Sequence, residues 1–367
     1  MLVLTLALVA VAQDSVGTVW TEDTPDARVR IEVVATSLVA PAGLSFLPDG
    51  RLLIADRPAG ALSVLDLTTR TRTLIDSVPP VHGKVDGGLL DVLVSPDYHR
   101  TGWIYLVSAI EVPGGNTTVV DRAHLIGGHL ANRQRLFIAA PVIPNSNEFG
   151  ARLVLDHGYL FVSLGQRNLP ENAQDLGSDL GKIIRLREDG RIPSTNPFVH
   201  VRGARPVIWS YGHRNPVGLA IDPSTGILWE HEHGPQGGDE INIVRRGHNY
   251  GWPVITYGVE YGGKPVGRGL THYPGMEQPV FYYNPDIAPS GMIVYRGDRF
   301  PRWKGSLFLG ALVSRCLDRL VVANDRVMHE ERLFEDRRWK VRSVQAGPDG
   351  SIYIGVDGGM VLRLTPA

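Results

Sequence analysis

The chain has 367 residues, and its 37 lysines and arginines nearly balance its 38 aspartates and glutamates. This balance argues against a nucleic-acid-binding protein, because such proteins normally present a strongly basic face. Hydrophobic residues make up 43% of the sequence, which argues against disorder, and 42 glycines with 26 prolines indicate many turns. A hydrophobic core divided by many turns favours an all-β fold.

Residues 1–12 are apolar and end in Ala10-Val11-Ala12. The run is too short to span a bilayer, which takes about 20 residues, and it resembles a secretory signal with its cleavage site. We therefore expect a secretory segment at 1–12, a single domain over 13–367, and a periplasmic or secreted protein. A buried N-terminal strand is the alternative. No later segment predicts a membrane span.

A tight turn followed by a short apolar strand recurs six times along the chain. The turns are rich in Pro, Asp and Gly, and the residues after them have strand composition. The six copies are centred on Gly50, Gly102, Gly158, Gly226, Gly305 and Gly350. Another short strand precedes most copies, so each copy predicts a β-hairpin. Because a lone hairpin is only marginally stable, the six hairpins must pack together.

The spacing of the copies predicts a six-bladed β-propeller with long inserted loops on one face. A four-stranded blade takes about 40–50 residues. The six glycines lie 45 to 79 residues apart, so the excess must form inserted loops. We expect the strand at 29–34 to pair with the last strand, 360–364, and thereby to close the ring. A pair of β-sandwiches is the less favoured alternative.

Polar residues concentrate in the middle of the chain, at 213–216 (His-Arg-Asn-Pro) and at 231–242. This density of His, Arg, Asn, Gly and acidic residues exceeds what packing requires, and it favours a site for an anionic, metal-linked ligand. His213, His231 and His233 also suggest a transition-metal site, which is the lesser hypothesis. The single cysteine, Cys316, excludes a disulfide within the chain, and its apolar neighbours favour a packed core thiol.

Ordered motifs along the chain resemble those of the soluble glucose and aldose sugar dehydrogenases that depend on pyrroloquinoline quinone (PQQ). The resemblance extends from about residue 40 to residue 364. It implies a six-bladed propeller that oxidises an aldose at C1 to the lactone, with hydride passing to PQQ and electrons to an external acceptor. The motifs are Gly87-Gly88-Leu89-Leu90-Asp91-Val92, Tyr211-Gly212-His213-Arg214-Asn215-Pro216, Glu232-His233-Gly234-Pro235, Gly238-Asp239-Glu240-Ile241-Asn242, Asn249-Tyr250-Gly251-Trp252-Pro253 and Gly347-Pro348-Asp349-Gly350.

The resemblance also implies which residues hold the cofactors. Arg214 and Asn215 match a pair that contacts PQQ, and Arg214 would stabilise negative charge on the reduced quinone. A salt bridge between blades is the structural alternative for Arg214. The other positions that match PQQ contacts are Tyr261, Leu312, Val313, Lys340 and Arg342.

Two calcium ions are implied in the same way. The carbonyl groups of Gly234 and Pro235 would hold calcium bound to PQQ, and hard oxygen ligands of this kind suit that ion. A second, structural calcium would be held by Glu240 and by the carbonyl group of Tyr250.

The chain departs from the family pattern at the expected base. Residues 148–153 read Glu-Phe-Gly-Ala-Arg-Leu, and Glu148 stands where the family has a histidine. A carboxylate can accept a proton, although it is a weaker base than imidazole. We expect Glu148 to be the catalytic base, with Arg214 as the other catalytic residue.

Other departures lie at expected ligand contacts. Asp86 replaces a glutamine, and with Asn147 it is expected to contact the sugar. Val313 stands where a lysine often follows Gly-Ala-Leu. Lys340 replaces an arginine, and lysine cannot form the bidentate fork that arginine makes with a carboxylate.

Three functions are consistent with these residues. The favoured one is a PQQ- and calcium-dependent sugar dehydrogenase, whose partners would be a sugar and an external electron acceptor, with no nucleic acid. The second is a propeller that binds a carbohydrate or a partner but has lost the reaction. The third is a calcium-dependent, lactonase-like hydrolase, although no converging set of ligands identifies one. The chain is expected to be a monomer or a homodimer.

Overall fold

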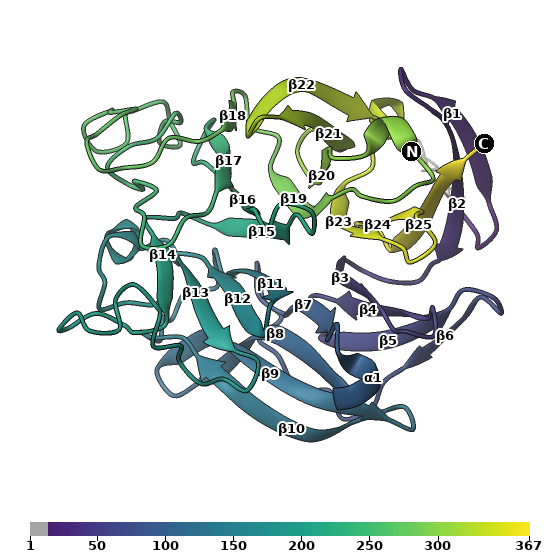
Figure 1. Ribbon diagram of the computed structural model, residues 1–367, viewed down its shortest axis with the longest axis horizontal. Helices are drawn as coiled ribbons and strands as arrows, with labels where there is room; N and C mark the ends of the chain where they lie inside the picture. Colours follow the sequence, from purple (N-terminus) through teal and green to yellow (C-terminus); the bar gives the residue numbers. More distant parts are fainter. Residues whose placement is uncertain (1–13) are drawn as a thin grey trace, which may run out of the picture.

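The computed structural model describes residues 14–367, which form mainly β-strands and loops (Figure 1). Helix within this range is limited to α1 (Tyr98–Thr101) and three 3-10 turns, η1 (Pro170–Ala173), η2 (Pro301–Trp303) and η3 (Glu335–Arg337). No helix among the described residues is long and apolar enough to cross a membrane. The secretory segment expected at 1–12 lies outside the described residues, so it stays a prediction, as does the single domain over 13–367.

Six antiparallel sheets surround a central axis, and the predicted six-bladed propeller is confirmed (Figure 1). Blade 1 comprises β3 (Pro41–Phe46), β4 (Leu52–Asp56), β5 (Ala61–Asp66) and β6 (Thr71–Leu74). Blade 2 comprises β7 (Leu89–Val94), β8 (Trp103–Val112), β9 (Gly115–Ile126) and β10 (His129–Ile138). Blade 3 comprises β11 (Gly150–Asp156), β12 (Tyr159–Leu164), β13 (Lys182–Arg187) and β14 (Ile208–Tyr211).

The second half of the ring follows the same plan. Blade 4 comprises β15 (Pro216–Ile221), β16 (Leu228–Glu232), β17 (Asp239–Ile243) and β18 (Phe281–Tyr283). Blade 5 comprises β19 (Pro289–Val294), β20 (Leu307–Ala311), β21 (Cys316–Ala323) and β22 (Arg326–Leu333). Blade 6 comprises β23 (Val341–Ala346), β24 (Ile352–Val356) and β25 (Met360–Pro366), together with β2 (Arg28–Ala35) and β1 (Val19–Asp23).

All six predicted hairpins form, and each supplies the first two strands of a blade. In blade 1, for example, Gly50 lies in the turn between β3 and β4, and in blade 6 Gly350 lies between β23 and β24. The first strands of successive blades pack against each other around the whole ring. The recurring turn therefore marks the innermost hairpin of each blade.

The ring is closed by the strand expected to close it. β2 pairs antiparallel with β25, and this pairing places Ile31 opposite Leu364. β1 then adds a fifth strand that the sequence did not predict. Both ends of the described chain thus belong to blade 6, where Figure 1 shows them side by side.

The hydrophobic core lies between neighbouring blades rather than in one central mass. Each of the six blade interfaces has its own cluster of buried apolar side chains. Cys316 is buried in the cluster between blades 4 and 5, where burial raises the pKa of its thiol to about 12, so the predicted core thiol is confirmed. The space on the axis is left for polar residues.

Blade 5 also buries an acid whose protonation should affect stability. Burial raises the pKa of Asp318 to about 7, although the Tyr283 hydroxyl donates to this carboxyl group. An unfolded chain releases this proton near pH 4, so between about pH 4 and pH 7 the folded state binds more protons. The free energy of unfolding should therefore fall as the pH rises through this range. In urea unfolding, Asp318→Asn should weaken this pH dependence by about 1–4 kcal/mol.

Candidate active site on the propeller axis

A polar cavity of about 150 Å³ lies at the axis. Every blade contributes to its wall, because the first strands of all six blades converge there. Its polar lining includes three arginines, Arg57, Arg152 and Arg342, but Asp86 is the one acid among the described residues that line it. A cavity with this charge balance suits an anionic ligand.

Two of these arginines are already engaged. Arg152 donates to the carbonyl groups of Ala42, Val217 and Arg342, which belong to three different blades. Arg342 forms a two-pronged ion pair with Asp357. Arg152 therefore links the blades around the cavity, whereas Arg342 is held within blade 6.

Arg57 is different, because its buried Nε has no hydrogen-bond partner in the described chain, although Nη1 donates to the carbonyl of Val85.

Glu148 lies beside this cavity, and its side chain is held on both carboxylate oxygens. Arg214 Nη2 is 2.7 Å from Oε1, so the two residues form an ion pair. Gln166 Nε2 donates to Oε2, and the backbone N–H of Asn168 donates to the same oxygen at 3.1 Å. Three donors thus hold the carboxylate in place, and Glu148 as a whole is only 7% exposed.

Asp86 fixes the main chain of the same residue. Glu148 has a positive φ of 51°, an uncommon conformation for a residue with a side chain, and its N–H donates to Asp86 Oδ2 at 3.0 Å. Asn147 precedes it, and its carbonyl accepts a hydrogen bond from Arg167. The structure thus brings Asp86, Asn147 and Glu148 together, as predicted.

Arg214 joins blade 3 to blade 4. Besides its ion pair with Glu148, its Nη1 donates to the carbonyl of His233 at 3.1 Å, and its guanidinium lies 5.2 Å from the Trp252 ring centroid. The salt bridge between blades, which was the structural alternative for Arg214, is therefore observed. The predicted contact with PQQ would involve the same side chain. Its buried Nε has no partner among the described atoms.

Asn215 binds the backbone next to Glu148. Its Oδ1 accepts a hydrogen bond from the N–H of Gly150 at 3.1 Å. Gly165, directly after β12, leaves the space for this arrangement. A Cβ atom on Gly165 would lie 2.7 Å from Asn215 Oδ1 and still closer to the carbonyl oxygen of Glu148.

Gly165→Ala should therefore displace Glu148 without removing any polar group. We expect a loss of stability of about 1–3 kcal/mol, since the new methyl group must push backbone atoms aside. If Glu148 acts as the predicted base, kcat should also fall by tenfold or more (~1 kcal/mol or larger in the barrier), because the carboxylate would be displaced. Thermal unfolding and steady-state kinetics measure the two effects. An unchanged kcat would mean that the backbone adjusts without moving the carboxylate.

The other predicted PQQ contacts fall into two groups. Leu312 and Arg342 line the cavity, as does Asn215. Val313 and Lys340 are exposed, and Tyr261 is 78% exposed in the long segment between β17 and β18. None of these three exposed residues is part of the described cavity wall.

Residues predicted for the two different calcium ions meet at a second, much smaller cavity, Gly234 from the PQQ-linked set and Glu240 with Tyr250 from the structural set. Gly234, Glu240 and Tyr250 all line a space of about 10 Å³, at the lower limit for one water molecule or ion. Pro235 is buried in the same loop. Burial raises the pKa of Glu240 to about 7, so a cation would compensate a costly buried charge. The residues present fit a calcium ion.

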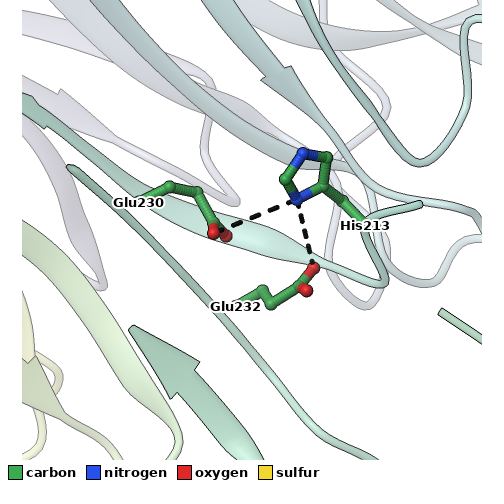
Figure 2. Close-up of side chains that lie close together, drawn as sticks. All are labelled: His213, Glu230 and Glu232. Atoms are coloured by element: carbon green, nitrogen blue, oxygen red, sulfur yellow. Dashed lines mark ion pairs between the residues drawn. The ribbon is translucent and has the colours of Figure 1, made fainter. Parts of the chain in front are cut away.

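The three histidines of the transition-metal hypothesis do not converge. His233 Nε2 lies 2.7 Å from the carbonyl oxygen of Pro289, and His231 packs against Gly218. His213 instead faces Glu230 and Glu232, and within residues 14–367 these three are the residues whose possible ligand atoms gather (Figure 2). Burial raises the pKa of both glutamates well above the usual range.

Several important residues were missed by sequence reasoning. Gln166 and Asn168 follow the buried strand β12 directly, and polar residues at the end of a buried strand were a usable signal. Arg57 follows the buried strand β4 in the same way. Trp252 stands inside the motif at 249–253, but nothing in the sequence indicates that its ring lies beside Arg214.

Comparisons with known proteins agree with this geometry. The sequence model of the Glucose / Sorbosone dehydrogenase family matches residues 38–363. The aldose sugar dehydrogenase of Escherichia coli K12 is 39% identical over 347 residues, which cover 93% of this chain and 94% of that protein.

Two solved structures extend the comparison. The soluble aldose sugar dehydrogenase of Escherichia coli in its apo-form superimposes with a TM-score of 0.88 at 39% identity, covering 92% of this chain and 100% of that one. The PQQ-bound aldose sugar dehydrogenase of Streptomyces coelicolor gives a TM-score of 0.74 at 27% identity, covering 93% and 99%.

Proposed function

The chain belongs to the glucose/sorbosone dehydrogenase family, and on that premise we propose that it oxidises an aldose at C1 to the lactone, with PQQ and calcium as cofactors. The observation that carries the proposal is the convergence of Glu148, Arg214, Asn215 and Asp86 beside the axial cavity. These residues come from three different blades or their connecting loops. Packing alone gives no reason for gathering two acids and an arginine there.

The residues around the cavity fit an anionic cofactor. The buried Nε atoms of Arg57 and Arg214 have no partner among the described residues, and each can donate to a carboxylate or quinone oxygen. When bound there, PQQ would supply the hydride acceptor. Leu312 and Arg342 would lie against it, and the carbonyl groups of Gly234 and Pro235 would hold its calcium. Tyr261, Val313 and Lys340 are proposed to contact it from the rim.

Glu148 would accept the proton from the C1 hydroxyl of the sugar. Its Oε2 already accepts two hydrogen bonds, whereas Oε1 is held by Arg214 alone. Oε1 is therefore the oxygen with a lone pair free for a proton. If Arg214 turned toward a bound anion, Oε1 would be free to face the C1 hydroxyl of the sugar. Asp86 and Asn147 would orient the sugar.

One observation favours a second candidate, a propeller that binds a ligand without turnover. In this structure both oxygens of Glu148 are occupied by donors from the protein itself. If this network held Glu148 away from a bound sugar, the proton could not be transferred. The lactonase-like alternative has less support, because Asp86 is the one carboxylate among the described lining residues of the axial cavity.

Reconstitution separates these functions. The purified chain is mixed with PQQ and calcium, and dye reduction is measured across a panel of aldoses. Turnover that requires both cofactors supports the dehydrogenase. Tight PQQ binding without turnover of any aldose supports the binding-only propeller. No PQQ binding, together with lactone hydrolysis that a chelator abolishes, would overturn the proposal in favour of the hydrolase. N-terminal sequencing of the mature protein tests the proposed export at the same time.

A further inference from the structure

A buried cluster of ligand-type side chains lies behind the candidate active site, outside the axial cavity. Strand β16 alternates, so Glu230 and Glu232 point to one face of blade 4 and His231 points to the other. His213, in the loop before β15, lies over the face that carries the two glutamates (Figure 2). Glu230 and His213 are 0% exposed, and Glu232 is 3% exposed.

The contacts within this cluster leave ligand atoms unused. His213 Nε2 lies 2.9 Å from Ser210 Oγ, which holds the ring with its other nitrogen directed at the glutamates. His213 Nδ1 lies 3.9 Å from Glu230 Oε2 and 3.8 Å from Glu232 Oε2, beyond hydrogen-bond range. Neither His213 Nδ1 nor Glu230 Oε1 has any hydrogen-bond partner among the described residues. Buried polar atoms are seldom left in this state without a ligand or water.

We propose that His213 Nδ1, Glu230 and Glu232 bind one divalent transition-metal ion. One ligand atom from each residue lies within 4.8 Å of the other two, so small side-chain movements would bring all three onto a single ion. A neutral imidazole nitrogen with two carboxylates suits ions such as zinc, cobalt or iron(II). Calcium prefers oxygen ligands throughout, so this site differs in chemistry from the one proposed at Glu240 and the carbonyl of Tyr250.

Surrounding groups already orient the three ligands. Asn242 Nδ2 donates to Glu230 Oε2 at 3.1 Å, and the backbone N–H of Arg214 donates to Glu232 Oε2 at 2.5 Å. The His213 ring stacks on Tyr250 with 4.6 Å between the centroids. Metal sites in proteins typically have such a supporting shell of hydrogen bonds.

The cluster also lacks a positive charge to balance it. The nearby Lys182 uses its Nζ to donate to three backbone carbonyl groups, those of Asn172, Ala173 and Leu180. Arg214 directs its side chain to Glu148. Neither cation pairs with Glu230 or Glu232, so a divalent ion at the site would offset the cost of burying these two side chains as carboxylates.

A metal here would act on the active site through the main chain. Glu232 accepts the N–H of Arg214, so an ion that fixes Glu232 also fixes the backbone that carries Arg214. The ion is thus expected to have a positioning role. This inference is independent of the proposed function, because it concerns the chain without PQQ or sugar.

Cobalt binding tests the site directly. The full chain, without a histidine tag and treated with a chelator, is titrated with Co²⁺ in the absence of PQQ and calcium, and visible absorption is recorded. We expect one Co²⁺ per chain that excess Zn²⁺ displaces. Glu230→Gln and His213→Gln should each weaken Co²⁺ binding by about 100-fold or more, since each removes a direct ligand. Asp318→Asn, which removes another buried carboxylate, should bind Co²⁺ as the unaltered chain does.

A second measurement distinguishes the loss of a metal ligand from the unfolding of a variant. Co²⁺ should raise the Tm of the unaltered chain, of Asp318→Asn and of Glu240→Gln, but not that of Glu230→Gln or His213→Gln. The proposal is wrong if the unaltered chain binds no Co²⁺. It is equally wrong if the Glu230 and His213 variants keep the Tm increase, or if Glu240→Gln is the variant that loses it.

Discussion

Replacing Glu148 with glutamine should lower kcat of the reconstituted enzyme by about 100-fold or more, the usual contribution of a general base. Glutamine has the same size and can still accept a hydrogen bond from Arg214, but its amide cannot take a proton from the sugar. The fold should survive, because the side chain keeps its shape. Steady-state dye reduction with saturating PQQ and calcium measures kcat, and direct titration measures PQQ affinity.

Glu148→His is the informative companion variant, because it restores the residue that the family pattern has at this position. If a base acts here, this variant should keep turnover, and the pH profile of kcat/KM should move toward the titration of an imidazole, near pH 6.5. Full activity in Glu148→Gln would show that another group takes the proton. Asp86 would then be the next candidate, since it lies within hydrogen-bond distance of the same backbone.

The ion pair between Glu148 and Arg214 should produce strong coupling in a double-mutant cycle. Both side chains are about 10% exposed, so removing one partner leaves a buried charge without compensation. We expect Arg214→Gln alone to lower the free energy of unfolding by about 3–5 kcal/mol. Adding Glu148→Gln to it should recover much of that loss, because two neutral amides can hydrogen-bond to each other. Urea unfolding of the four proteins measures the coupling.

Lys340→Gln provides the matched control for this cycle. Lys340 is an exposed cation at another predicted cofactor position, so its replacement should change stability by no more than about 0.5 kcal/mol. Additive losses for Glu148→Gln and Arg214→Gln would contradict the coupling. The carboxylate would then be held by Gln166 and Asn168 rather than by Arg214.

The fold could be predicted from the sequence because its signals are local. The inner hairpin of each blade contains a recognisable turn, such as the one at Gly50. Residues only a few positions apart determine that turn. The pairing of β2 with β25 is far from local, yet it was predictable, because a ring of hairpins has no other way to cover its last edge. Closing the ring does not require the added strand β1, and the sequence did not predict it.

The candidate site was only partly predictable. Glu148, Arg214 and Asn215 stand inside recognisable motifs, so their convergence could be expected. Gln166 contacts Glu148 across a loop, and nothing in the spacing of the two residues reveals that contact.

At residues 230–233 the sequence suggested the histidines as metal ligands. In the structure the two glutamates, and not His231, face His213. The alternation of a strand shows which residues share a face, but not which neighbour that face will meet.

The closure of the ring has a consequence for biosynthesis. Strand β2 is translated long before its partner β25, although Ile31 pairs with Leu364 in the folded chain. At about 5–20 residues per second, this delay lasts tens of seconds. Throughout that time β2 can pair with β1 alone, and a lone hairpin is only marginally stable. Blade 6 can therefore be completed only after β25 has been translated, and the nascent chain carries an open strand edge until then.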